Sequence, residues 1–522
     1  MCWQWLAMRA PDGHNGSMAF DVAVIGSGIG GLVAATRCAQ AGARVVLLEA
    51  GKQFGGYLNP FARRHFHFDP GLHYIGEAGP GGSFRRLLAR LQLGDIAFDE
   101  LNPEAFDRYQ FPEFEVANCV GLERFRDRLV DLEPRERAAL HRFFDLVLAL
   151  DESMSLMAKP GLLRAIQSTP SLIKLAPFVR ATLGQMLDSL FESQRIKSAL
   201  AGPVGDLGLP PSRLSALMLL GLLAHYRRGA FFPRGGAGPM RDAFLRELRA
   251  CDAELRRNAR VTRILMESGG AAGVELEGGE RIDARLVISN AQASDTYRMV
   301  GLETLPRRLR RKVEGVRHSV SSITMYCGVQ ETLETEHVGS SNIWRYHTEN
   351  IDDAFSDANL RSFEGPKSFF LTVPTHKDSS GSLAPDGFKT VELVTLVRGE
   401  PYARYFDQRT SRRDESYTAL KEKLRDSLLA QAEDVLPGLR EQLVFAEVAT
   451  PATNVSFVGA PLGNIYGPEH GPDGVGPFRF PAKTPVPRLF LCGASTQSAG
   501  IVPCASSGSY AASLALRELR LT

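Results

Sequence analysis

Apolar and polar positions near the start of the chain follow the pattern of a strand, a helix and a second strand. Residues 22–25 form a short apolar run that predicts a buried parallel strand, and residues 32–41 are compatible with a helix. Gly42 is suited to the C-terminal cap of that helix, because glycine adopts the left-handed conformation without strain. A second apolar run covers residues 45–48. The pattern therefore predicts a strand–turn–helix–strand unit.

The patterns that follow predict a mixed chain with a second, inserted domain. One long region is helix-like and is cut into short helices by prolines, whereas a later region holds strands separated by polar connections. In chain order, the expected elements are short helices within 122–226, a strand at 260–264, a hairpin of 273–276 and 281–288, strands at 321–329, 368–373, 390–397 and 443–448 with a helix within 414–436, a strand at 488–496 and a helix at 504–520.

The turn after the first strand is rich in glycine. Gly26, Gly28 and Gly31 match the spacing G-x-G-x-x-G. Gly26 allows a tight turn, Gly28 lets a pyrophosphate approach the backbone, and Gly31 lets the helix pack on the strand. The N–H groups at the helix start suit the pyrophosphate charge, and Glu49 can accept hydrogen bonds from ribose hydroxyls. Together these features predict a dinucleotide-binding unit; the alternative is a glycine-rich turn in an unrelated α/β protein.

Composition and charge exclude several classes of function. At 522 residues the chain is expected to form at least two domains. A net charge of +2 argues against a nucleic-acid surface, and seven scattered cysteines without a C-x-x-C pair predict neither a disulfide framework nor a metal site. No apolar run reaches the roughly 18 residues of a membrane-spanning helix. We expect a cytoplasmic protein whose residues 1–19 form a disordered extension.

Three further motifs extend the glycine-rich unit. Residues 49–56 read E-x-G-x-x-x-G-G, residues 68–76 read F-D-x-G-x-H-Y-x-G, and residues 493–496 read G-A-x-T after a buried strand. With the first unit, they resemble the motifs of the FAD-dependent phytoene desaturase, carotenoid isomerase and retinol saturase superfamily. The motif at 68–76 is most similar to the retinol saturase and carotenoid isomerase branch. Flavin amine oxidases usually carry arginine after the glycine pair, where this chain has Tyr57.

The resemblance implies an α/β fold with a Rossmann-type FAD-binding domain of the glutathione reductase-like class, an inserted α+β substrate domain and a helical lid region. The implied boundaries are 20–110, 225–300 and 450–522 for the FAD-binding domain, 111–224 for the helical region and 301–449 for the substrate domain. FAD is the expected cofactor. The residues expected to bind it are Gly26, Ser27, Gly28, Ile29, Gly30, Gly31, Glu49, Ala50, Gly51, Lys52, Gly55, Gly56, Tyr57, Val261, Asn290, Gly493, Ala494, Ser495, Ile501 and Val502.

Flavin chemistry at a carbon–carbon bond moves a hydride and a proton, so the site needs a side chain that can carry a proton. The candidates are His73 and Tyr74 in the motif at 68–76, and Tyr466 and His470 in a stretch similar to the saturase branch. For each of the four, the alternative is a hydrogen-bonded structural role near FAD. Cys504 is expected near the flavin edge, where a packing role is favoured.

The expected function is that of an FAD-dependent oxidoreductase that desaturates, saturates or isomerises carbon–carbon bonds of a long apolar polyene or isoprenoid lipid. Two alternatives are a flavin-dependent oxidase or isomerase of another apolar substrate, such as a fatty acid or an amine, and a non-catalytic lipid-binding escort protein. Because the chain shows no second dinucleotide fingerprint, the expected electron acceptor is oxygen, a quinone or a redox partner.

Apolar residues between Leu172 and Leu190 fall at helical spacing, with Lys174 and Arg180 beside them. This stripe predicts either an interfacial helix, which gives the protein a peripheral membrane contact, or a helix packed on its own core. Acidic residues near its end favour the second interpretation.

Overall fold

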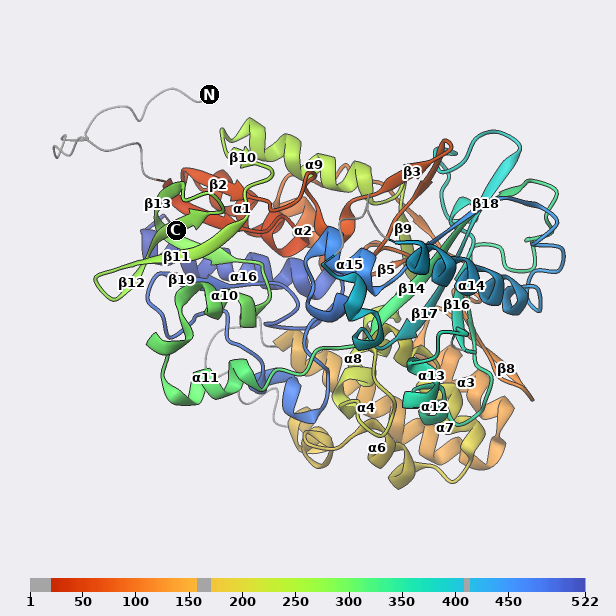
Figure 1. Cartoon of the computed structure of the whole chain (residues 1–522). Helices are drawn as coiled ribbons and strands as arrows, with labels where there is room; N and C mark the ends of the chain where they lie inside the picture. Colours follow the sequence, from red (N-terminus) through yellow and green to blue (C-terminus); the bar gives the residue numbers. More distant parts are fainter. Residues whose placement is uncertain (1–19, 157–169, 366, 408–413, 522) are drawn as a thin grey trace.

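Two seven-stranded sheets organise the chain (Figure 1). The computed structural model describes residues 20–156, 170–365, 367–407 and 414–521. The extension predicted at 1–19 lies outside these residues.

The first sheet contains the predicted strand–turn–helix–strand unit. Its strands are, in order across the sheet, β10 (Glu254–Arg256), β2 (Val45–Leu48), β1 (Phe20–Ile25), β13 (Arg281–Ser289), β12 (Gly270–Leu276) and β11 (Val261–Glu267), with β19 (Leu489–Leu491) also paired to β13. β10, β2, β1, β13 and β19 pair in parallel, and β11 to β13 form the predicted antiparallel meander. The α/β class expected from the sequence is confirmed.

Side chains of the first sheet alternate between two covered faces, as a central parallel sheet requires. Val22 and Val24 pack with α1 (Ile29–Gln40), α9 (Ala237–Ala250) and α16 (Ile501–Leu519). Ala23 and Ile25 pack on the opposite face with the β11–β12 hairpin and α10 (Ala293–Val300). Gly42 has a φ of +84° directly after α1, which confirms its predicted place at the end of that helix.

The two ends of the chain meet at α1 and α16, which lie side by side in Figure 1. A Cβ atom on Gly508 would lie 2.1 Å from the carbonyl oxygen of Gly30, so the two backbones touch where both helices carry glycine. Nη1 of Arg37 in α1 donates to the carbonyl oxygen of Ser509 at 2.7 Å. The first and last segments therefore build one unit.

The second sheet contains the strands that were predicted between 321 and 448. In order across the sheet they are β18 (Leu443–Ala449), β14 (Ser321–Gln330), β17 (Phe388–Val397), β16 (Phe369–Thr372), β15 (Asn342–Arg345), β7 (Asp107–Gln110) and β8 (Glu115–Asn118). The hairpin of β7 and β8 was not predicted as part of this sheet. Helix α14 (Glu415–Ala432) covers one face, through a core that includes Leu371 and Leu393.

The helical region expected between 122 and 226 is confirmed for 122–156 and 170–226, and these residues pack against the other face of the second sheet; residues 157–169 lie outside the described ranges. It lies below that sheet in Figure 1. Its longer helices are α3 (Leu122–Leu132), α4 (Arg137–Leu156), α6 (Leu183–Leu190), α7 (Gln194–Ala201) and α8 (Ala216–Tyr226). The remaining named strands and longer helices are β3 (Phe61–Arg63), β4 (Phe66–Phe68), β5 (Ile75–Gly76), α2 (Ser83–Arg90), β6 (Phe98–Glu100), β9 (Ala230–Pro233), α11 (Arg307–Glu314) and α15 (Pro451–Val458).

The apolar stripe between Leu172 and Leu190 does not form one helix, so that expectation is wrong. A 3₁₀ turn at Ala176–Phe178, which contains Pro177, interrupts the stripe, and α6 starts again only after a capping box at Thr182. Proline lacks the N–H that a continuous helix needs there. Residues of α6 are buried in the helical core, whereas Leu172 and Ile173 are exposed. Across the described ranges, no helix has the length and apolar character needed to cross a bilayer.

Candidate active site

The glycine-rich turn is packed so closely that side chains would not fit. A Cβ atom would lie 1.9 Å from the carbonyl oxygen of Gly26 if placed on Gly31, and 2.5 Å from Oδ1 of Asn290 if placed on Gly30. On Gly28 it would lie 2.9 Å from Nδ2 of Asn290. The helix begins at Ile29, three residues earlier than predicted, because Gly30 and Gly31 can both enter the first turn of α1.

Asn290 and Gly493 close this turn from the ends of two neighbouring parallel strands. Asn290 follows β13, and its N–H donates to the carbonyl oxygen of Ile25 at 2.8 Å. Gly493 follows β19 with a φ of +84°, and a Cβ atom there would lie 2.7 Å from Oδ1 of Asn290. Ligands of parallel sheets bind at this carboxyl edge. We call residues 26–31, 55–56, Asn290 and Gly493 the glycine cradle.

Glu49, at the end of β2, is held in a fixed position beside the cradle. One carboxylate oxygen accepts from the N–H of Ser27 at 3.1 Å and from the Ser27 hydroxyl, and the other accepts from the N–H of Gly51 at 2.7 Å. The Ser27 hydroxyl also accepts from the N–H of Gly55 at 2.9 Å. This anchors the loop that holds Gly55 and Gly56, and a Cβ atom on Gly56 would lie 3.3 Å from Cα of Gly28.

Among the other residues predicted to bind the cofactor, some lie close to segments that build the cradle and others are exposed. Val261 begins β11, and the N–H of Ala259 just before it donates to the carbonyl oxygen of Glu49 at 2.8 Å. The hydroxyl of Ser495 accepts from the N–H of Ala293 at 3.1 Å. Ala50 and Lys52 are exposed. Helix α16 begins at Ile501 and Val502, and no side chain caps its first turn.

This arrangement fits a dinucleotide cofactor. The glycines of the cradle place no side chain over the turn, a carboxylate stands at the end of β2, and the uncapped start of α16 offers backbone N–H groups and a partial positive charge. Gly26 to Gly31 and Glu49 would hold the adenosine and pyrophosphate half. The segment from Gly493 to Val502 would hold the flavin half of FAD.

His470 is buried and ties the loop before α16 to the helical region. Its Nε2 accepts from the N–H of Ala499 at 3.3 Å and lies 3.3 Å from the hydroxyl of Ser498, while its carbonyl oxygen accepts from the N–H of Ser215 at 2.9 Å. Burial, with the nearby charge of Arg479, holds the pKa of His470 well below its usual range. The imidazole is therefore neutral near pH 7, and its contacts are those of a residue that orders this loop.

A row of buried polar side chains crosses the second sheet on the face away from α14. The strand register places Tyr326, Glu392, Thr372, Asn342 and Asp107 side by side on β14, β17, β16, β15 and β7. Each of these residues is at most 3% exposed. Their neighbours along the strands, such as Leu371 and Leu393, face α14 instead. We call these five residues the polar row.

Lys377 covers the middle of the polar row. Its Nζ donates to the carbonyl oxygen of His73 at 3.0 Å and to Oδ1 of Asn342, and Nδ2 of Asn342 donates to Oδ1 of Asp107 at 2.9 Å. Burial lowers the pKa of Lys377 to about 7, although the charges of Asp107 and Glu392 oppose this shift. Burial raises the pKa of Asp107 to about 6, against the effects of the Asn342 hydrogen bond and of Lys377.

His73 and Tyr74, two of the predicted catalytic residues, lie against this row. Nδ1 of His73 is 3.1 Å from Oε2 of Glu392. The Tyr74 hydroxyl is 2.8 Å from Oδ2 of Asp206 and 3.2 Å from Oδ2 of Asp107. Burial, together with the charge of Asp107, raises the pKa of Asp206 to about 7. The structure thus joins the predicted pair to four ionisable residues that the sequence did not single out: Asp107, Asp206, Lys377 and Glu392.

Tyr466 lies within the field of Asp206, and the residue after it packs against the segment that follows Gly493. A Cβ atom on Gly467 would lie 3.2 Å from Cβ of Ala494, and one on Gly208 would lie 2.7 Å from Cδ2 of Tyr466. Burial, together with the charge of Asp206, raises the pKa of Tyr466 well above its usual range. The hydroxyl of Tyr57 reaches the same segment and donates to the carbonyl oxygen of Asn464 at 3.1 Å.

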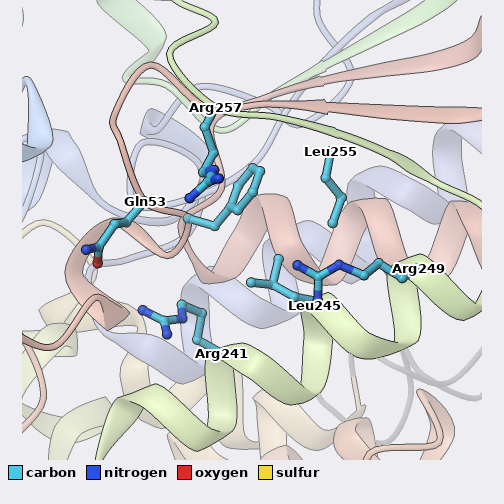
Figure 2. A pocket seen from close by; sticks show the side chains of 7 residues that line it. Gln53, Arg241, Leu245, Arg249, Leu255 and Arg257 are labelled. Carbon is cyan, nitrogen blue, oxygen red and sulfur yellow. The ribbon is translucent and has the colours of Figure 1, made fainter.

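A pocket of about 450 Å³ lies elsewhere, between α9, β10 and the loop before Gly55. Figure 2 shows the side chains of Arg241 and Arg249 on α9 and that of Arg257 above them. Arg241 is already bound, because its Nε donates to Oδ1 of Asp242 at 2.8 Å and its Nη1 to Oδ1 of Asn59 at 2.9 Å. None of the predicted catalytic residues lines this pocket, so we do not assign it to the reaction.

Three or more metal-ligating side chains do not cluster in the part of the chain that the structure describes. Its six cysteines, Cys38, Cys119, Cys251, Cys327, Cys492 and Cys504, are free thiols. Burial raises the pKa of Cys504 to about 12, so this thiol is not a nucleophile at neutral pH. Its Sγ donates to the carbonyl oxygen of Ser498 at 3.6 Å.

Comparisons with known proteins agree with this architecture. The chain is 27% identical to the all-trans-retinol 13,14-reductase of Danio rerio, over 96% of this chain and 87% of the relative. It is 26% identical to a chloroplastic prolycopene isomerase of an Oncidium hybrid cultivar, over 86% of this chain and 75% of the relative. An oxidoreductase from Methanosarcina mazei superposes with a TM-score of 0.65 at 18% identity, covering 94% of this chain and 99% of that one.

The fold similarity extends to an amine-oxidising enzyme. A putrescine oxidase bound to putrescine superposes with a TM-score of 0.62 at 17% identity, over 96% of this chain and 99% of that one. The model of the family described as flavin containing amine oxidoreductase matches residues 29–516, which is nearly the whole chain. The chain therefore belongs to the flavin-containing amine oxidoreductase family, and it is an FAD-dependent oxidoreductase.

Proposed function

We propose that this enzyme acts on carbon–carbon double bonds of a long apolar polyene of the retinoid or carotenoid type. The observation that carries the proposal is the match, along most of the chain, to a retinol reductase and a prolycopene isomerase. Both names describe a change at a double bond of a conjugated isoprenoid. Tyr57 in place of an arginine after the glycine pair supports the same branch over amine oxidation.

The surroundings of the polar row support an apolar, flat substrate. The ring of Tyr74 stacks on Tyr226 at a centroid distance of 4.9 Å, and the rings of Trp344 and Phe370 meet edge to face at 4.8 Å. Aromatic side chains offer large apolar contact areas with few degrees of freedom to lose. Conjugated chains would pack on these rings.

We propose saturation as the favoured direction. When bound, FAD supplies or accepts the hydride. Reduction of a double bond also consumes a proton, and the buried acids next to Tyr74 provide groups that can hold one at neutral pH. Isomerisation without net electron transfer needs no such store.

A single-turnover experiment tests this function. The FAD-loaded enzyme is reduced with dithionite without oxygen and is then mixed with all-trans-retinol or with a poly-cis carotene. We expect a retinoid or carotenoid to reoxidise the flavin and to lose one conjugated double bond, as seen by mass spectrometry and absorption. Putrescine mixed with the oxidised enzyme is the matched comparison. Flavin reduction by the amine, with no reaction of any polyene, would contradict the proposal.

A peripheral membrane contact is a separate proposal for substrate entry. Leu172, Ile173 and Val179 are exposed apolar residues, and Lys174 and Arg180 lie beside them. Such a surface suits the boundary of a lipid bilayer. Sedimentation with neutral and anionic lipid vesicles tests it, and a protein that stays in the supernatant with both would contradict it.

A further inference from the structure

The position of the Tyr74 hydroxyl sets a requirement on the number of protons in the cluster. Its oxygen lies 2.8 Å from Oδ2 of Asp206 and 3.2 Å from Oδ2 of Asp107. A phenol has one proton and can donate to only one of the two carboxyl groups. The second contact is a hydrogen bond only if that carboxyl group is protonated and donates to the phenol oxygen. One proton beyond those of a phenol and two carboxylates would make both contacts full hydrogen bonds.

The contacts of the two carboxyl groups show which one holds this proton. Asp107 also accepts from Nδ2 of Asn342 at 2.9 Å and lies within the field of Lys377, both of which favour its charged form. Within the described ranges, Asp206 has the Tyr74 hydroxyl as its side-chain contact and no cation beside it. Asp206 is half-buried, and its partial desolvation and the nearby charge of Asp107 favour its neutral form. Asp206 is therefore the protonated member.

We propose that Asp206 stores an exchangeable proton, which it shares with Asp107 through the Tyr74 hydroxyl, and that this store supplies the proton consumed when the substrate double bond is reduced. This inference rests on the proposed function. The Asp206 proton forms a new C–H bond at one carbon of the double bond, while the hydride from reduced FAD forms the C–H bond at the other. The substrate gains two electrons, FAD is oxidised, and Asp206 is left as a carboxylate that solvent reprotonates.

Asp206 is placed to serve the flavin side of the molecule. Its charge acts on Tyr466, and the residue after Tyr466 packs against Ala494 in the segment expected to hold the flavin. The chain of Asp107, Tyr74 and Asp206 thus leads from the polar row to the surroundings of Tyr466. The titratable groups that face it from the surrounding elements are Lys377, Glu392, Tyr109, Tyr226, Tyr346 and Tyr466.

Infrared difference spectroscopy tests the store without substrate and without turnover. The FAD-loaded protein is titrated from mildly acidic to alkaline pH, and the C=O band of protonated carboxyl groups is followed. We expect the intensity of the bands that disappear near neutral pH to fall by one carboxyl group in Asp206→Asn and to be unchanged in Asp145→Asn, where an exposed aspartate of α4 is changed. Asp107 and Asp69, whose pKa values burial raises to about 6 and about 8, keep their own bands in both variants. Bands of unchanged intensity in folded Asp206→Asn would overturn the proposal.

Tyr74→Phe gives a second test that does not depend on the Asp206 variant. It removes the hydroxyl that links the two carboxyl groups, so we expect the Asp206 band to shift and its titration point to move. An unchanged band and titration point in Tyr74→Phe would overturn the shared-proton chain. Circular dichroism identifies variants that have lost their fold.

The rate of substrate-driven flavin oxidation then separates this inference from the proposed function. Loss of a positioned acid slows proton transfer about 10²- to 10⁴-fold, so Asp206→Asn should slow reoxidation by a polyene to that extent. Asp206→Glu should recover part of the rate, and reoxidation by oxygen should not change. If Asp206→Asn reacts with the polyene at the wild-type rate, the proton store plays no part. If no polyene reacts with the wild type although the band titrates as expected, the proposed function fails and the store remains.

Discussion

The glycine cradle and the polar row are built on opposite principles. The cradle works because its glycines carry no side chain: a Cβ atom on Gly31 would lie 1.9 Å from the Gly26 carbonyl oxygen, and one on Gly30 would lie 2.5 Å from Oδ1 of Asn290. The polar row works because side chains are present, and Asp107 and Asn342 are buried with hydrogen-bond partners. Close backbone packing therefore determines whether the cradle keeps its shape, and the protonation states of the side chains determine the hydrogen bonds of the polar row. A substitution should have different consequences in the two.

The largest effect is expected for Gly31→Ala in the cradle. The added methyl group would meet the Gly26 carbonyl, and a backbone atom in the turn has no free space to move into. The cost should exceed the roughly 3 kcal/mol of ordinary overpacking, with loss of FAD binding. Thermal unfolding and the FAD-to-protein ratio measure it. The control is Gly221→Ala in α8, where the nearest atom is 3.8 Å away and where alanine should stabilise the helix by about 1 kcal/mol. Equal behaviour of the two variants would contradict the shape argument.

The next largest effect is expected for Lys377→Met. This change leaves the His73 carbonyl oxygen and Oδ1 of Asn342 buried without the donor that Nζ of Lys377 provides, and each unsatisfied buried group costs about 1–3 kcal/mol. Denaturant unfolding near neutral pH measures the loss. Lys423→Met is the control, because the Lys423 side chain is 56% exposed and its loss should cost less than about 0.5 kcal/mol. Adding Asp107→Asn to Lys377→Met should restore part of the stability, and a purely additive double variant would argue against the coupling.

The pH dependence of stability should change in Asp206→Asn. The folded pKa of Asp206, about 7, lies above the ordinary value of 3.8, so the folded state binds more protons between these values. Stability should therefore fall as pH rises from about 4 to about 7, by up to roughly 4 kcal/mol from this group. Asp206→Asn should remove that part of the slope and be more stable than the wild type above pH 7. Unfolding free energies across pH check this, and an unchanged slope would count against a buried acid.

The smallest of these effects is expected for Glu49→Ala. The variant loses a carboxylate that would accept hydrogen bonds from the ribose, and each charge-assisted bond is worth about 1.5–3 kcal/mol, or roughly 10- to 150-fold in the dissociation constant of FAD. Titration of the apoprotein with FAD measures it. Glu267→Ala, an exposed position on β11, is the control. FAD binding as tight as that of the wild type would show that Glu49 does not hold the adenosine.

The cradle could be predicted from the sequence because most of it is local. Gly26, Gly28 and Gly31 lie within six residues of one another, and apolar runs predict the strands on either side. The prediction of one helix between Leu172 and Leu190 was wrong for a local reason too. The apolar residues keep helical spacing on both sides of the 3₁₀ turn that contains Pro177, so periodicity alone did not reveal the break. The placement of Gly493 beside Gly30 required the family motif, since 463 residues separate them in the chain.

The polar row could not be predicted in this way, because it exists only through strand register. Asp107, Asn342, Thr372 and Glu392 come from four strands, and a slip of one residue would turn each toward α14. His73 and Tyr74 were found because they belong to a motif. Asp206 gave one weak signal, a charged residue within an apolar stretch, which many surface residues share, and Lys377 gave none, because it lies in the polar segment 375–380. What distinguishes these two residues is their position in the folded protein, which cannot be read from the sequence.

The account assigns FAD binding to the cradle and proton supply to the region of the polar row. The most direct test is the rate of polyene-driven flavin oxidation per bound FAD, measured in parallel for Glu49→Ala and Tyr74→Phe. We predict that Glu49→Ala lowers the amount of bound FAD but leaves the rate per bound FAD close to that of the wild type. Tyr74→Phe should retain its FAD and lose most of the rate. The reverse pattern, with FAD lost from Tyr74→Phe and a slow reaction in FAD-saturated Glu49→Ala, would contradict the account.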